Sequence, residues 1–126
     1  MTINNLDEFV NNLWDWSILD GCFGNTRIHP TDVDGLVERN GKFLLIEAKS
    51  PGVEIKTGQM IMFNKLVHTG YFTVILVWGE INNPEKITLM TSKTIEVYEN
   101  ISLDKLREIT SKWFIWANQT PTPKFD

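Results

Sequence analysis

The sequence predicts an α/β domain with a mixed central β-sheet flanked by helices. Asn40-Gly41 joins two apolar stretches, which is the pattern of a β-hairpin with a type I′ turn. A helical pattern at residues 57–69 then separates this hairpin from a continuous apolar run at residues 71–78. Strands on either side of one crossover helix pair in parallel, so the sheet should be mixed. The length of 126 residues suits a single domain, residues 1–126, with one core.

The N-terminal part is expected to hold a helix and a short strand. In residues 6–16, apolar side chains recur at helical spacing and polar ones occupy the other side, as in an amphipathic helix. Residues 27–29 are expected to form a short strand before Pro30, because the residue before a proline is held extended.

The hairpin is expected to cover residues 32–49. A two-residue turn fixes its register, so Arg39 faces Lys42 and paired residues have numbers that add up to 81. Apart from one charged end, both faces of the hairpin are apolar. Its strands should therefore be central in the sheet and covered on both sides.

The charged end of the hairpin is the first candidate site. The register places Asp34 opposite Glu47, and Asp32 opposite Lys49 on the same face. Opposed like charges are destabilising, and a half-buried carboxylate pair is costly unless a cation or proton neutralises it. A hard divalent cation with oxygen ligands would relieve the repulsion. The alternative is a solvated strand end where Lys49 pairs with Glu47 or Asp32.

A helix and a buried strand are expected next. Thr57 suits the N-cap of a helix that runs to residue 68 or 69, and Gly70 suits its C′ position. Gln59 lies in the first turn of this helix, where it can reach back toward the acidic strand end or remain solvated. The β-branched and aromatic run at residues 71–78 indicates a buried strand.

Residues after about 79 are expected to extend this core. Residues 86–90 and 94–98 are expected to form two short strands, or one strand and an edge segment, before a helix at 103–117 that Ser102 caps. The tail at 118–126, with two prolines, should be irregular.

Composition favours an intracellular protein. No apolar run approaches the roughly 20 residues that span a bilayer, and the N-terminus lacks the pattern of a signal peptide. Cys22 is the only cysteine, so no intrachain disulfide can form, and a reducing, cytoplasmic setting is expected, in a cell or in the host of a phage. The net charge of −4 argues against indiscriminate nucleic-acid binding, but it is compatible with a nucleic-acid enzyme whose acids hold a metal.

Taken together, these motifs resemble the PD-(D/E)XK nuclease superfamily. The similarity rests on the order helix, short strand, hairpin, helix and strand, with Asp34 on the first hairpin strand, Glu47-Ala48-Lys49 on the second, and Gln59 after it. The nearer likeness is to the virus-type replication-repair nucleases (VRR-NUC) and to archaeal-type Holliday junction resolvases. It covers roughly residues 5–78. The usual Pro-Asp pair is replaced by Val33-Asp34.

The resemblance implies a restriction-endonuclease-like core (αβββαβ) and a metal-dependent DNA endonuclease, of the type that resolves Holliday junctions or selects other branched DNA. It implies that Asp34, Glu47 and the backbone carbonyl of Ala48 bind Mg²⁺ or Mn²⁺, with no small-molecule cofactor. Lys49 would orient or deprotonate the attacking water, and Gln59 would help to place water or substrate. Small members commonly act on DNA as homodimers.

Two further acids each have two interpretations. Many family members use an acid from the first helix, for which Glu8 is the best-placed candidate, although a solvated position fits it equally well. Asp32 could lie behind the metal ligands or simply pair with Lys49. Two alternative functions also stay open: a catalytically silent nuclease-fold protein that acts as a binding or inhibitor subunit, and an unrelated α/β domain with a coincidental E-x-K.

Overall fold

The computed structural model describes residues 14–121, which fall into two compact units divided between Asp32 and Val33. The first unit contains the 3₁₀ helix η1 (Trp16–Leu19), where the Asp15 carboxylate accepts a hydrogen bond from the Ser17 N–H at 3.0 Å. Most of the helix predicted at residues 6–16 lies outside the described residues. At its end the prediction is wrong, since residues 14–15 are not helical and Trp16 begins η1.

The strand predicted at residues 27–29 is not formed. The Thr26 hydroxyl donates a hydrogen bond to the Phe23 carbonyl at 2.7 Å and accepts one from the Ile28 N–H at 3.2 Å. This local bonding takes up a backbone N–H that a strand would offer to a neighbour, and such side-chain bonds compete with regular structure.

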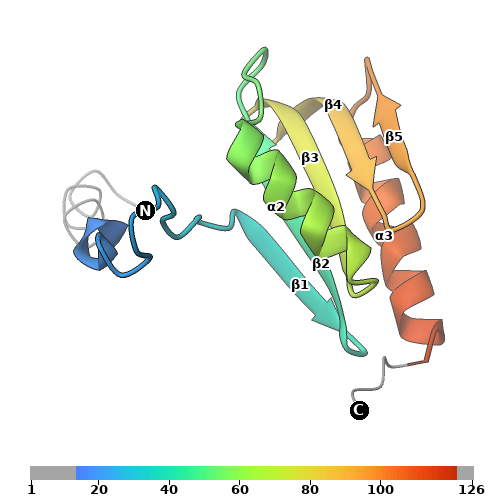
Figure 1. Cartoon of the computed structure of the whole chain (residues 1–126). Coiled ribbons are helices and arrows are strands. Elements are labelled where there is room, and N and C mark those ends of the chain that lie inside the picture. The colour runs from blue at the N-terminus through green and yellow to red at the C-terminus, as the bar shows by residue number, and fades with distance from the viewer. Residues whose placement is uncertain (1–13, 122–126) are drawn as a thin grey trace, which may run out of the picture. The chain divides into compact units, whose positions relative to one another are not determined.

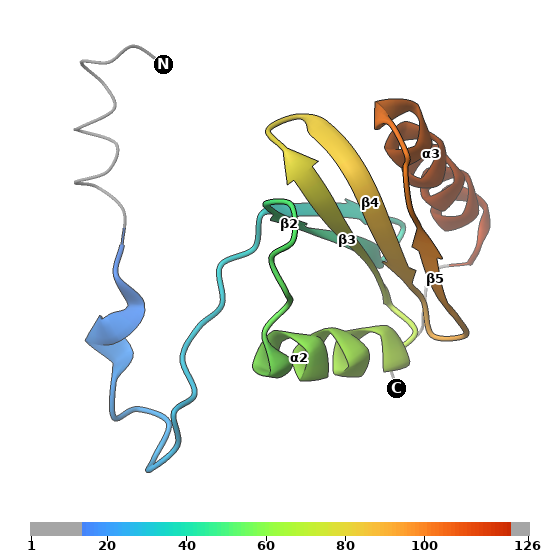
Figure 2. The same cartoon turned by 90° about the horizontal axis from the view of Figure 1, so that it is seen from above.

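The second unit contains the predicted α/β arrangement. Its described residues form one five-stranded mixed sheet of order β1-β2-β3-β4-β5, in which β2 and β3 are parallel and the other neighbours antiparallel. Two helices, α2 and α3, lie on opposite faces of this sheet (Figures 1 and 2). The elements are β1 (Gly35–Arg39), β2 (Lys42–Lys49), α2 (Thr57–His68), β3 (Phe72–Glu80), β4 (Asn83–Met90), β5 (Ile95–Tyr98) and α3 (Leu103–Gln119).

The β1–β2 hairpin has the predicted turn and register. Asn40 and Gly41 have φ of 56° and 77°, as a type I′ turn requires, and Arg39 pairs with Lys42. The pairing ends at Gly35 and Ile46, so Asp34 lies just before the ladder instead of inside it.

The expectation that both hairpin strands are central is wrong for β1. The sheet extends through β3 to β4 and β5, which makes β2 an interior strand and leaves β1 at an edge. Leu36 and Val37 are consequently 54% and 44% exposed. An apolar sequence on both faces therefore did not distinguish an edge strand from a central one.

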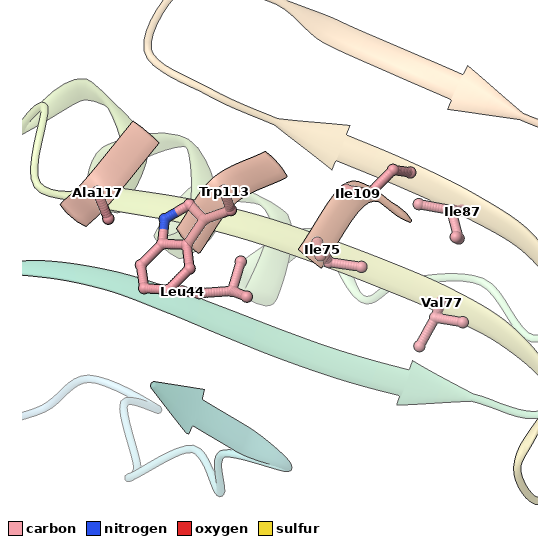
Figure 3. Packing of buried hydrophobic residues seen from close by; sticks show 7 residues of the cluster. All are labelled: Leu44, Ile75, Val77, Ile87, Ile109, Trp113 and Ala117. Atoms are coloured by element: carbon pink, nitrogen blue, oxygen red, sulfur yellow. The ribbon is translucent and has the colours of Figure 1, made fainter. Parts of the chain in front are cut away.

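Each face of the sheet packs against one helix. Trp113 of α3 reaches down to Leu44 of β2, and the cluster continues along β3 and β4 (Figure 3). On the other face, Phe63 and Val67 of α2 are buried with a second set of strand residues. Because Leu44 and Leu45 alternate between the two clusters, β2 is buried on both faces, as its sequence predicted. The strand residues of the second cluster are Leu45, Val74, Leu76 and Met90.

The helix boundaries follow the predictions closely. Thr57 is the first residue of α2 and Lys56 occupies the N-cap, one position earlier than predicted, while Gly70 has the expected left-handed φ of 82°. Ser102 is the N-cap of α3. This helix continues to Gln119, so the predicted start of the irregular tail at residue 118 was too early.

Residues of the hairpin turn form hydrogen bonds with the C-terminal end of α3. Lys42, only 2% exposed, directs its ammonium to the carbonyls of Thr120 at 2.9 Å and of Ala117 and Asn40 at 3.4 Å. The Asn40 amide donates to the Ala117 and Thr120 carbonyls at 3.3 and 2.6 Å. The last carbonyls of a helix have no partner within it, and a cation there is also favoured by the helix dipole. We call these contacts of Asn40 and Lys42 the C-terminal clasp.

Candidate active site

Four of the predicted site residues come together in the second unit. Asp34 directly precedes β1, Glu47 and Lys49 lie at the end of β2, and Gln59 is in the first turn of α2. The loop after β2 returns the chain so that α2 begins beside this strand end. The parallel β2–α2–β3 crossover therefore brings Glu47, Lys49 and Gln59 together at the end of β2, and the β1–β2 hairpin brings Asp34 to the same strand end.

Asp34 is anchored by the backbone of the opposite strand. Its Oδ2 accepts a hydrogen bond from the Ala48 N–H at 2.8 Å. Ala48 itself lies inside β2, opposite Val77 of β3. The Asp34 side chain thus bonds to the residue next to Glu47. The prediction that Asp34 and Glu47 pair with each other in the strand ladder is wrong, because the pairing ends at Gly35 and Ile46.

Glu47 is the most buried acid of the cluster, with 5% exposure. Its Oε1 accepts a hydrogen bond from the Gln59 amide at 3.3 Å and lies 3.4 Å from the Lys49 ammonium. Burial, and then the negative charge of Asp34, raise the pKa of Glu47, whereas Lys49 and Gln59 act to lower it. The site therefore holds a carboxylate whose charge is only partly compensated.

The donor set fits a divalent cation with oxygen ligands. The observed bonds use Oδ2 of Asp34 and Oε1 of Glu47, which leaves a second oxygen on each carboxylate. Oε1 of Gln59 is buried without a hydrogen-bond partner, and a cation's water ligands would supply the donor it needs. Residues 14–121 hold no cluster of three or more metal-binding acids, histidines or cysteines. Mg²⁺ is commonly held by one or two carboxylates with water completing its shell.

The two remaining candidate acids are not in the described part of the second unit. Asp32 belongs to the first unit, where it accepts a hydrogen bond from the Trp16 indole at 3.0 Å. Its predicted place opposite Lys49 in the ladder is wrong, because β1 begins only at Gly35. Glu8 lies outside the described residues.

Sequence reasoning missed the contact between Asp34 and the Ala48 N–H. A strand register gives which residues face one another, but not which side chain bonds to the backbone once the ladder stops. Gly35, which follows Asp34, does not signal this contact, because an ideal Cβ there would lie at an ordinary van der Waals distance of 3.5 Å from that of Ile46.

Replacing Glu47 with glutamine should stabilise the protein at neutral pH, in the absence of divalent cations. A raised pKa means that the folded state prefers the protonated acid, so the contribution of Glu47 to stability is fully present below the ordinary value of 4.5 and is lost as the pH rises through the folded value. Glutamine keeps the shape without the charge, and we expect a gain of about 0.5–2 kcal/mol at pH 7 that vanishes near pH 4.

Denaturant unfolding of both proteins across this pH range would measure the difference, with Glu54→Gln in the exposed loop as the matched control. A gain that did not change with pH would contradict the assignment of the effect to the Glu47 charge.

Comparisons with known proteins do not identify the chain. No family model, curated protein or solved structure matches it. Within residues 14–121, no helix is both long and apolar enough to cross a membrane.

Proposed function

We propose that this protein is a metal-dependent DNA endonuclease with a restriction-endonuclease-like core. The observation that carries the proposal is the placement of Glu47: a 5%-exposed carboxylate beside Asp34, with Lys49 at 3.4 Å. A solvated strand end would leave these groups in water, which screens like charges. Here Glu47 is buried, which opposes its ionisation, and ionisable residues with perturbed pKa values are common in active sites.

Asp34 and Glu47 are the residues that would hold Mg²⁺ or Mn²⁺, together with the backbone carbonyl of Ala48. When bound, such a cation polarises a phosphate oxygen and lowers the pKa of water. Ionised Glu47 is required for this, so cation binding should increase as the pH rises through the raised pKa of this acid.

Lys49 is the residue proposed to act on the attacking water and the phosphate. Its ammonium is held by Glu47 and its side chain is 20% exposed, so it can contact a substrate without losing its anchor. Neutral Lys49 could accept the proton of water, and its charged form stabilises negative charge on the phosphate.

Gln59 is proposed to position water or substrate. The amide is oriented by its hydrogen bond to Glu47, and the buried Oε1 then remains as an acceptor for a water O–H.

The direct test is cleavage of labelled DNA by the purified full chain. Linear duplex, single-stranded and four-way-junction substrates should be compared with Mg²⁺, with Mn²⁺ and with a chelator. We expect cleavage that needs the cation and is lost in Asp34→Asn, together with preferential cleavage of the branched DNA by a homodimer. Metal-independent cutting, or full activity of Asp34→Asn, would refute the assignment.

A catalytically silent binding protein is the second candidate, and the net charge of −4 favours it because phosphate binding relies on lysine and arginine. Calorimetric titration with Mg²⁺ and Mn²⁺ separates the two. The nuclease should bind at least one cation, with affinity lost in Glu47→Gln, whereas the silent protein should show no binding that depends on Glu47.

A further inference from the structure

A pocket of about 450 Å³ lies away from the candidate active site, on the sheet face that α3 covers. Its walls come from the start of β3, the β4–β5 turn, β5 and α3. Asp34, Glu47, Lys49 and Gln59 are not among the residues that line it. The active-site residues follow the end of β2, whereas the pocket includes Gly70 and the first residues of β3, which runs parallel to β2. The two sites are therefore at opposite ends of these strands.

The interior of the pocket is apolar and rich in aromatic groups. Trp113 and Ile109 are buried, at 6% exposure each, while Trp116 remains 44% exposed. Pockets of 300–1,000 Å³ with apolar and aromatic walls are typical of small-molecule sites. The residues that form these walls are Phe72, Leu89, Tyr98, Ile109, Trp113 and Trp116.

The charged groups of the pocket are mostly positive. Three lysines and one acid, Glu96, line it, although the whole chain carries a net charge of −4. The Tyr98 hydroxyl donates a hydrogen bond to Glu96, which keeps its negative charge, so the lysines outnumber the acid three to one. The local charge therefore favours an anion. The three lysines are Lys93, Lys105 and Lys112.

Two of these lysines, Lys105 and Lys112, form ion pairs with Glu108, whose carboxylate an anionic ligand could replace. Lys112 and Lys105 lie 3.0 and 3.5 Å from the Glu108 carboxylate, and Glu108 is 46% exposed and does not line the pocket. Exposed ion pairs of this kind are weak, so an anion in the pocket can exchange with Glu108 at little cost.

We infer that this pocket binds a small amphipathic anion, with an apolar or aromatic body and one carboxylate or phosphate. The body packs between Trp113, Trp116 and Leu89, and the anionic group meets the lysines at the mouth. This inference does not depend on nuclease activity.

The test uses 8-anilinonaphthalene-1-sulfonate, a fluorescent aromatic anion, titrated into the full chain. We expect one saturable site. Decanoate should displace the probe if the pocket accepts carboxylates, and thymidine 5′-monophosphate if it accepts nucleotide phosphates. Decanol has the same chain without the charge and should compete at least threefold more weakly than decanoate. Equal competition by decanol and decanoate, or no displacement by either anion, would contradict the inference.

Variants locate the site. Trp116→Ala should weaken probe binding about tenfold, whereas Ile115→Gln changes the neighbouring exposed residue outside the pocket and should not. Because Trp116→Ala could disturb folding, the exposed pair Lys93→Gln/Lys112→Gln gives an independent readout, with an expected loss of at least threefold and Lys65→Gln on α2 as its control. Unchanged binding in the double-lysine variant, or equal loss in Ile115→Gln, would overturn the inference.

Discussion

Lys49→Met is expected to reduce metal-dependent DNA cleavage by a factor of about 10²–10⁴, the usual contribution of a positioned acid–base group. The substitution keeps the length of the side chain but removes the ammonium that lies 3.4 Å from Glu47. Its loss should further favour the protonated form of Glu47, since Lys49 is one of the groups that lower the pKa of that acid. Cation affinity must therefore be measured in parallel, and the rates compared at saturating Mg²⁺.

Lys49→Arg distinguishes the two roles proposed for this residue. Arginine retains the positive charge but does not give up its proton in a protein. A large recovery of rate in Lys49→Arg would assign the residue to charge stabilisation, and no recovery would assign it to proton transfer. Lys56→Met, in the exposed loop before α2, is the matched control. Full activity of Lys49→Met at saturating metal would exclude both roles.

Lys42→Met is expected to cost about 2–4 kcal/mol of stability and to lower the Tm by roughly 10 °C or more. The ammonium of Lys42 is buried and reaches three carbonyls, those of Asn40, Ala117 and Thr120. It also lies 5.5 Å from the centre of the Trp116 ring. Methionine preserves most of the packing of the stem, but it leaves these carbonyls without a charged donor.

Thermal and denaturant unfolding of Lys42→Met would measure this loss. Lys65→Met removes an exposed lysine from α2 and should stay within about 0.5 kcal/mol of the parent protein, as surface substitutions usually do. An equally small effect in Lys42→Met would show that the Lys42 contacts of the C-terminal clasp do not contribute to stability.

Most of the second unit could be predicted because its signals are local. The Asn40-Gly41 turn needs only two residues, and its length sets the whole β1–β2 register. Gly70 marks the end of α2 for a similarly local reason, since few other residues adopt its φ of 82°. The α/β class and the mixed sheet followed from these signals.

What could not be predicted depends on contacts between distant segments. The exposure of β1 was set by where the sheet adds further strands, which the hairpin sequence does not encode. Lys42 flanks the hairpin turn, and the end of α3 buries it, a contact that the hairpin sequence does not encode. The pocket combines a stripe of α3 with the β4–β5 turn. The spacing of that stripe, residues 105, 109, 112 and 116, is visible in the sequence, but its partner surface is not.

In the candidate site, too, the residues could be predicted from the sequence, whereas their contacts could not. Asp34, Glu47, Lys49 and Gln59 were identified from type and spacing, and the fold brings them together. The manner of their contact differs from the prediction, because the ladder stops at Gly35 and Asp34 bonds to a backbone N–H instead of opposing Glu47 directly.

The C-terminal clasp also has a consequence for the order of folding. It joins Asn40 and Lys42 of the hairpin turn to Ala117 and Thr120, and the bonded residues are separated by 75 to 80 positions in the sequence. These contacts are therefore among the least local of the fold. Such contacts bear a large loop-closure entropy and form late unless they belong to the nucleus. We therefore expect the clasp to form after the transition state, so that Lys42→Met raises the unfolding rate more than it lowers the folding rate. Interactions that form this late slow unfolding and contribute kinetic stability.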